Sequence, residues 1–250
     1  MKNFYKINSN KIFVGALCLL IALNIFGTVS ENALFLQSTK PLFIPVFLIF
    51  FFIRNKVIIL PFILFLLFSF LGDSASMFFS NETFLKASSI MYLLSYFCLV
   101  GFVAPKFNFE KINIVIALYL IFVILINMYF LYTIYSILKT IVPDSLEVFL
   151  FGVKSISMIF LVIIAFGIYL TSETKLSILF LIMAISFVFS DILNYVSHYY
   201  VYHWSLLALD RILHVVGLFF FFKYIMEYNK LPKRLNEVND HHAYSKNILV

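Results

Sequence analysis

Long apolar runs follow one another along the whole chain, and they constrain its fold more than any other feature. A helix needs about 20 residues to cross the hydrocarbon core of a bilayer, which is about 30 Å thick. Eight windows reach or approach that length, at residues 12–30, 39–54, 57–79, 84–104, 112–137, 146–170, 175–196 and 205–226. The polar connectors between them are too short to hold a soluble domain. The sequence therefore predicts an all-α polytopic membrane bundle with eight transmembrane helices, in which residues 1–227 form a single domain.

The composition excludes a water-soluble domain. Hydrophobic residues make up 63% of the chain and charged residues 12%, whereas soluble domains have about 45–50% and about 25%. The 33 Phe and 15 Tyr residues are typical of a lipid-facing surface with aromatic belts at its interfaces. The net charge of +6 comes from lysines in short loops and tails, so we expect membrane lipids as partners and no nucleic acid.

The distribution of Lys and Arg predicts the orientation, because cytoplasmic loops carry an excess of both. With eight spans, thirteen of these residues fall on the side of the N-terminus, and only Lys40, Lys86 and Lys139 fall on the other side. Both termini are therefore expected in the cytoplasm, including a polar tail over 228–250, and we expect a bacterial cytoplasmic membrane. The second window is the weakest, since it holds Pro41 and Pro45, and a re-entrant segment is its alternative. A cleaved signal peptide is the alternative for the first window.

Two acidic residues stand at the far ends of apolar runs. The stretch Phe-Ser-Phe-Leu-Gly-Asp ends at Asp73, and Phe-Val-Phe-Ser-Asp ends at Asp191. Carboxylates in membrane segments are costly and usually face the interior of a bundle, where they mark function. Two acids that share one site push their pKa values apart and provide a proton donor and a base. We expect Asp73 and Asp191 to meet; the structural alternative is that they snorkel outward or pair with Lys154 and Arg211.

Further polar residues are predicted at the same depth. At 1.5 Å per residue, Asp73, Asn127 and Asp191 each lie about 24–26 Å above the cytoplasmic ends of their helices. The segments that run back toward the cytoplasm contribute further polar residues at this depth. The full set of expected substrate-binding residues is Lys40, Asn127, Lys154, Asp210, Arg211 and His214.

Some members of this layer have competing interpretations. Asp210 and His214 are four residues apart, a spacing at which an acid can orient an imidazole, although a simple hydrogen bond is an equal alternative. Lys154 is expected to pair with a carboxylate rather than to meet a phosphate. Tyr92 and Tyr96 are interpreted as packing residues with a satisfied hydroxyl. Because no cluster of metal-ligating residues is readable, we expect no metal and no cofactor.

Three ordered motifs carry a resemblance to a known family: Thr-Lys-Pro-Leu at 39–42 and the two acid-bearing stretches that end at Asp73 and Asp191. In these motifs the chain resembles the YhhN family of membrane proteins, whose animal members are lysoplasmalogenases. The resemblance implies eight membrane helices, Asp73 and Asp191 as the catalytic acids, and Lys40 near the entrance of the site. The chain departs from the family at Tyr96, where a histidine is frequent, and at His214, where a glutamine is frequent.

The activity that the resemblance implies is hydrolysis of the vinyl ether bond of a lysophospholipid, which gives an aldehyde and a glycerophospho head group. Lys40, Lys154 or Arg211 would then face the phosphate. An alternative from another class is a non-catalytic transporter or lipid-binding protein that uses the same carboxylates to couple protons or ions. A scaffold without turnover is a third interpretation.

Overall fold

The structure, a computed structural model, describes residues 2–30, 38–54, 59–78, 82–108, 110, 112–201 and 203–230. All regular secondary structure within these ranges is helical, which confirms the all-α class. The elements are α1 (Lys2–Val29), η1 (Lys40–Leu42), α3 (Phe43–Arg54), α4 (Leu60–Ser76), α5 (Glu82–Val103), η2 (Ala104–Lys106), α6 (Ile114–Ile141), α7 (Ser145–Ser172), α8 (Lys175–Tyr199) and α9 (Trp204–Tyr228). Most of the predicted tail lies outside the described residues.

Each of the eight predicted windows contains a helix, but the helices differ in length. Five are long and apolar enough to cross a membrane: α5 with η2, α6, α7, α8 and α9. Where the structure describes side chains, the apolar helices in the other three windows are shorter, at Gly15–Gly27, Lys40–Ile53 and Leu60–Ser76. The weak second window begins with the short helix η1, which holds Pro41. The protein is therefore embedded in a membrane through several apolar helices, while the full set of eight spans stays a prediction.

The long helices begin where polar side chains cap them. The Asn113 side chain accepts a hydrogen bond from the Ile114 amide at 2.7 Å, and Asp144 accepts one from the Leu146 amide at 2.9 Å. Thr174 and His203 cap α8 and α9 in the same way. Such caps satisfy amide groups that have no partner within the helix. They explain why these starts lie within two residues of the predicted windows.

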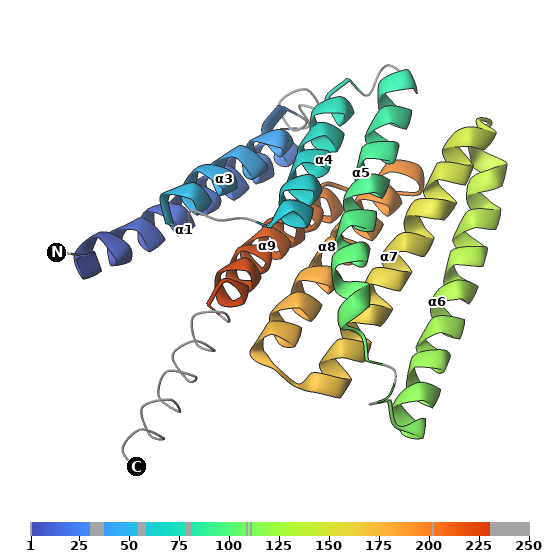
Figure 1. Ribbon diagram of the computed structural model, residues 1–250. Helices are drawn as coiled ribbons and strands as arrows, with labels where there is room; N and C mark the ends of the chain where they lie inside the picture. The colour runs from blue at the N-terminus through green and yellow to red at the C-terminus, as the bar shows by residue number, and fades with distance from the viewer. Residues whose placement is uncertain are drawn as a thin grey trace, which may run out of the picture.

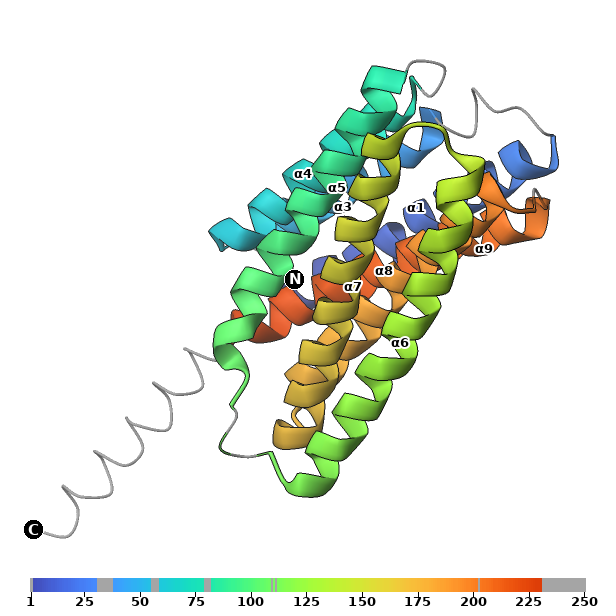
Figure 2. The ribbon, with the colours of Figure 1, turned by 90° about the vertical axis from the view of Figure 1, so that its right-hand side faces the viewer.

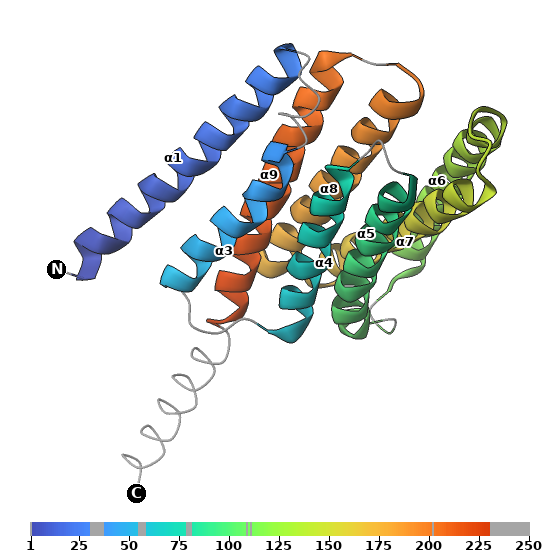
Figure 3. The same cartoon turned by 90° about the horizontal axis from the view of Figure 1, so that it is seen from above.

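The helices form two rows that are closed at one end by a helical hairpin. Seen from above, α1, α9 and α8 form one row and α3, α4 and α5 the other (Figure 3). The hairpin of α6 and α7 stands beside α5 and α8, with α7 between them and α6 (Figures 1 and 2). The interior of the bundle thus lies between α4 and α5 on one side and α8 and α9 on the other.

Aromatic side chains fill one part of this interior. The ring of Phe221 on α9 lies 5.3 Å from Phe62 and 4.9 Å from Phe65 on α4, both in edge-to-face arrangements. Phe65 also contacts Phe187 on α8, at 5.5 Å between ring centres. Phe187 packs so close to Gly217 that a β-carbon there would lie 2.7 Å from its ring. This packing holds α4, α8 and α9 together beside the polar groups that α4 and α8 carry.

Candidate functional site

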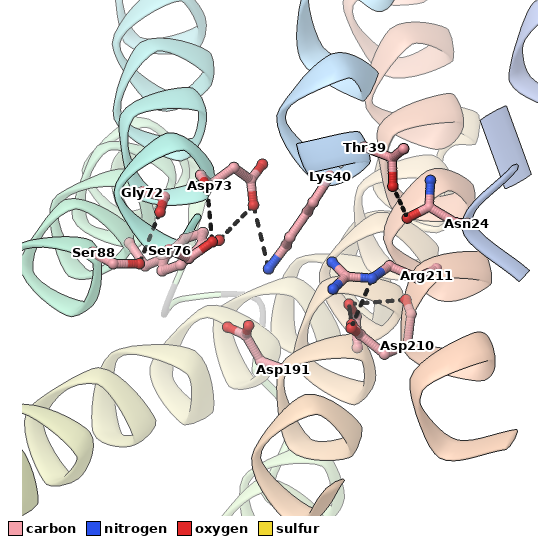
Figure 4. A network of polar contacts seen from close by, with 12 residues as sticks. Asn24, Thr39, Lys40, Gly72, Asp73, Ser76, Ser88, Asp191, Asp210 and Arg211 are labelled. Carbon is pink, nitrogen blue, oxygen red and sulfur yellow. Dashed lines mark hydrogen bonds and ion pairs between the residues drawn. The ribbon is translucent and has the colours of Figure 1, made fainter. Parts of the chain in front are cut away.

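Asp73 lies in the last turns of α4 and is fully buried. Its Oδ1 atom accepts a hydrogen bond from the hydroxyl of Tyr92 on α5, and the Lys40 ammonium lies 3.3 Å from the same oxygen. Gly72 makes this contact possible, because a β-carbon there would lie 3.1 Å from the Tyr92 ring. Ser88 fixes the two helices further by donating to the Gly72 carbonyl at 2.8 Å. Figure 4 shows Asp73 and Lys40 pointing toward each other.

Asp191 on α8 has the same kinds of partner. The hydroxyl of Tyr96 on α5 donates a hydrogen bond to its Oδ2 atom, and the Lys154 ammonium of α7 lies 3.5 Å from that oxygen. The ion pair with Lys154 agrees with the expectation that this lysine pairs with a carboxylate. Each acid therefore has one hydroxyl donor and one cation from other helices.

Tyr92 connects the two halves of the site. The Lys40 ammonium lies 5.1 Å from the centre of its ring and the Lys154 ammonium lies 5.3 Å from it. Both distances fall within the range of cation–π attraction. Tyr96 is one helical turn along on the same face of α5. The cations of both ion pairs thus contact one aromatic ring, so Asp73 and Asp191 belong to a single site.

A pocket opens between these groups. It is narrow, and it is lined by Lys40, Phe65, Ser69, Tyr92, Ser95, Tyr96, Phe187, Asp191, His214 and Leu218. Asp191 borders this space directly, whereas Asp73 reaches it through Lys40 and Tyr92, which contact its Oδ1 atom. Phe65, Phe187 and Leu218 are the apolar members of the lining, and the other lining side chains carry polar groups. The pocket therefore combines groups that can transfer protons with a surface suited to a hydrocarbon chain.

A second polar cluster lies next to the pocket on α8, α9 and α1. Ser190 on α8 donates a hydrogen bond to the carboxylate of Asp210, and the Nε atom of Arg211 lies 3.8 Å from the other carboxylate oxygen. Nearby, the Thr39 hydroxyl donates to the side-chain oxygen of Asn24 at 3.1 Å. Figure 4 shows the Thr39–Asn24 pair beside Arg211. Three ion pairs therefore stand close together inside the bundle.

Five atoms of these acids and bases have no hydrogen-bond partner among the described residues: Asp73 Oδ2, Asp210 Oδ2, Arg211 Nε, Arg211 Nη1 and His214 Nε2. All five are buried. Because buried polar groups in proteins are nearly always paired, such a concentration indicates a place where water or a ligand binds.

Most of the predicted site residues come together, and one does not. Asp73, Lys40, Asp191, Lys154 and His214 surround the pocket or pair with groups that line it. Asp210 and Arg211 lie beside it. Asn127 does not join them: it is exposed on α6, and its side chain donates to the Val123 carbonyl of the same helix at 2.8 Å. The depth argument failed for Asn127 because α6 packs on α7 at the outside of the bundle (Figure 2).

The structure adds to the interpretation of the two tyrosines and corrects that of the histidine. Tyr92 and Tyr96 do have satisfied hydroxyls, as expected for packing residues, but their acceptors are the two candidate catalytic acids. The i, i+4 spacing of the two tyrosines was the signal that could have revealed this. The expected contact between Asp210 and His214 is absent among the described residues, because Ser190 bonds to Asp210 while His214 lies between Phe43 and Phe187.

The donor set does not resemble a metal centre. Within the described parts of the chain, no group of three His, Cys, Asp or Glu side chains is placed so that it could hold a metal ion. The residues at hand offer carboxylates, hydroxyls and ammonium groups, which suit acid–base chemistry or the binding of a polar solute. No protein-family model, no curated protein and no solved structure matches the chain, so its function has to be inferred from the geometry of this site.

Proposed function

We propose that the protein is a membrane-embedded hydrolase that cleaves the vinyl ether bond of a lysoplasmalogen-type lysophospholipid by means of Asp73 and Asp191. The observation that carries the proposal is the convergence of these two acids, from helices far apart in the sequence, on one pocket. Each acid has a tyrosine hydroxyl and a lysine ammonium as partners. The three motifs shared with the YhhN family support the same activity.

The chemistry needs one proton donor, one water molecule and one base. A protonated carboxyl donates its proton to the outer carbon of the C=C–O unit, and the electron pair of the double bond forms the new C–H bond. The resulting oxocarbenium ion is stabilised by the second carboxylate, which also takes a proton from the attacking water. The hemiacetal then loses the glycerophospho alcohol, whose oxygen regains a proton, and leaves the aldehyde.

The pocket suggests how the two acids divide this work. Asp191 borders the pocket, so we assign it the contact with the vinyl ether and its leaving oxygen. Asp73 lies behind Lys40 and Tyr92, so we assign to the Tyr92 hydroxyl, which borders the pocket and donates to Asp73, the relay of a proton from the attacking water to that carboxylate. Phe65, Phe187 and Leu218 form the apolar wall that would receive the first carbons of the alkenyl chain. Only the vinyl ether group of the substrate has to enter the pocket, while the rest of the alkenyl chain extends between the helices.

The test is an assay of the purified protein in detergent micelles with an alkenyl lysophospholipid and with an acyl lysophospholipid of equal length. We expect aldehyde from the first and no fatty acid from the second. Asp191→Asn and Asp73→Asn should each lower the rate by about 10²–10⁴-fold, the usual contribution of general acid–base catalysis. Asn127→Ala is the matched control, because Asn127 lies outside the pocket. Full activity in either Asp variant would refute the assignment.

A second candidate is a proton- or ion-coupled carrier. The observation that favours it is the lysine beside each carboxylate, since exchangeable ion pairs inside membrane helices are typical of proton pathways. The same assay separates the two functions. If neither lipid yields a product, solute uptake driven by a pH gradient should appear in proteoliposomes and should be lost in Asp191→Asn.

We also propose that all eight helices span a bacterial cytoplasmic membrane, with both termini in the cytoplasm. The asymmetry of Lys and Arg supports this topology. It can be tested with cysteines placed singly at 3 and 81 in a variant without Cys18 and Cys98. A membrane-impermeant thiol reagent applied to intact cells should label the cysteine at 81 and spare the one at 3.

A further inference from the structure

We propose that Arg211, together with Lys40 and His214, forms a binding subsite for an oxyanion, and that its natural occupant is the phosphate of a single-chain phospholipid. The inference deepens the proposed function, on which it rests only for the identity of the lipid. It assigns to the second polar cluster the task of holding the head group beside the two acids.

The unpaired donors of Arg211 carry the argument. The residue is only 4% exposed, and its Nε and Nη1 groups have no hydrogen-bond partner among the described residues. A buried donor without a partner costs about 1–3 kcal/mol, and more when it is charged. A guanidinium is also the side chain best suited to phosphate, because its planar N–H groups match the oxygens of the anion. Nε and Nη1 lie on different edges of the guanidinium, so an oxyanion at either edge would satisfy one of these donors.

Asp210 does not fulfil this role. Its nearer oxygen lies 3.8 Å from Arg211 Nε, beyond hydrogen-bond distance, and its Oδ1 atom accepts from Ser190. Asp210 therefore offsets the charge of Arg211 without occupying its donors. A residue kept only to neutralise Asp210 would be expected to donate to it directly.

The position of Arg211 connects it to the pocket. Arg211, His214 and Leu218 lie at i, i+3 and i+7 on α9, which is one helical face, and the latter two line the pocket. Lys40 lines it from η1, and the guanidinium of Arg211 extends from α9 toward Lys40 (Figure 4). His214 adds a buried Nε2 atom without a partner. Lys40 and His214 thus line the pocket, and Arg211 lies beside it.

The proposed subsite requires donors for a phosphate and an apolar surface for the remainder of the ligand. Lys40, Lys154 and Arg211 are matched by Asp73, Asp191 and Asp210 in three ion pairs. A ligand phosphate would give Lys40 a second anionic partner and so weaken its hold on Asp73. The apolar wall of Phe65, Phe187 and Leu218 at the same pocket fits a hydrocarbon chain. A lipid phosphate satisfies both requirements, whereas free phosphate satisfies only the first.

The test measures binding, so that it does not depend on turnover. Purified protein in a neutral detergent is titrated with a 1-alkyl-glycerophospholipid, which has no vinyl ether, with the 1-alkyl-glycerol of equal length, and with inorganic phosphate. We expect Arg211→Met to weaken binding of the phospholipid at least tenfold and to leave binding of the alkyl-glycerol unchanged. Lys223→Met, which removes an exposed cation from the same helix, is the matched control.

A second variant keeps the test decisive if Arg211→Met leaves Asp210 unpaired and fails to fold. Asp210→Asn combined with Arg211→Met removes both charges and should show the same selective loss. Binding of inorganic phosphate that depends on Arg211 supports the oxyanion site and assigns it to a free anion. Phospholipid binding that is unchanged in both variants overturns the proposal. Absence of aldehyde with selective binding intact would count against the proposed hydrolase alone.

Discussion

Asp73 and Asp191 have the same kinds of partner but different surroundings. Each accepts a hydrogen bond from a tyrosine of α5 and pairs with a lysine at 3.3 or 3.5 Å. The side chains of Asp73 and Lys40 are 0% and 9% exposed, whereas those of Asp191 and Lys154 are 13% and 18% exposed. One pair is closed in the bundle and the other opens onto the pocket.

This difference shows how one pattern of contacts can serve two purposes. Removing either partner of a closed ion pair lowers the free energy of unfolding strongly, because the remaining charge has neither water nor a counterion. An open pair can exchange its partner for water or a ligand at lower cost. We infer that the Asp73 pair, in addition to its part in the reaction, fixes the geometry of η1, α4 and α5, while the Asp191 pair supplies the group that meets the substrate.

The largest expected effect is a difference in stability between the variants of the two acids, both of which lower activity. Asp73→Asn leaves the Lys40 charge buried and should lower the free energy of unfolding by about 3–5 kcal/mol, the usual cost of breaking a buried pair. Asp191→Asn should cost less, because Lys154 can reach water, while it removes turnover. Unfolding in detergent micelles measures the first quantity and the aldehyde assay the second. Equal stability losses would show that exposure does not distinguish the pairs.

Removing both members of the closed pair should restore much of the loss. Lys40→Met leaves Asp73 unpaired and should destabilise the protein about as much as Asp73→Asn does. The double variant leaves no buried charge, so its loss should be clearly smaller than the sum of the two single losses. The coupling energy from a double-mutant cycle measures this, and the corresponding cycle for Lys154 and Asp191 should give a smaller value. Strict additivity at Lys40 and Asp73 would contradict a closed pair.

Replacing the tyrosines that donate to the two acids should also affect stability more at Asp73 than at Asp191, but by smaller amounts. Tyr92→Phe leaves the buried Asp73 carboxylate without its hydroxyl donor and should cost about 1–3 kcal/mol. Tyr96→Phe should have a smaller effect on stability, because water can replace the hydroxyl at Asp191. Its effect should appear instead in the pH dependence of turnover. A Tyr96→Phe variant with an unaltered pH profile would limit Tyr96 to packing.

The sequence was sufficient to predict the helices and the meeting of the acids, and the reason is physical. The length of an apolar run predicts a membrane helix. A carboxylate at the end of such a run is costly in contact with lipid and is stabilised where it faces other polar groups. This reasoning placed Asp73, Asp191 and Lys154 correctly near one pocket. It misplaced Asn127, because depth along a helix says nothing about whether that helix packs inside the bundle or at its edge.

Contacts between side chains were harder to predict than depth. The choice of Ser190 rather than His214 as the partner of Asp210 depends on the rotation of α8 against α9, which no spacing within one helix determines. The roles of Tyr92 and Tyr96 depend in turn on Gly72, which lets α5 approach α4. Such facts arise from packing between helices, and a single sequence shows only the spacing along each of them.

A partly exposed ion pair provides the smallest expected effect and completes the series. Lys86 and Asp144 pair at the start of α7, and the hydrogen bond from Lys86 holds the pKa of the Asp144 carboxyl below its usual range. The pair should therefore stabilise the fold above about pH 4, the ordinary range of an Asp side chain, and lose this effect as the pH falls through the lowered value. Asp144→Asn keeps an acceptor for the Leu146 amide and removes only the charge. Its midpoint of thermal unfolding should differ slightly from that of the parent protein at pH 6, since solvent-accessible pairs contribute little, and the difference should shrink as the pH is lowered below the ordinary range of an Asp side chain. A large difference at pH 6, comparable with that of Asp73→Asn, would mean that burial is not what separates strong from weak pairs in this protein.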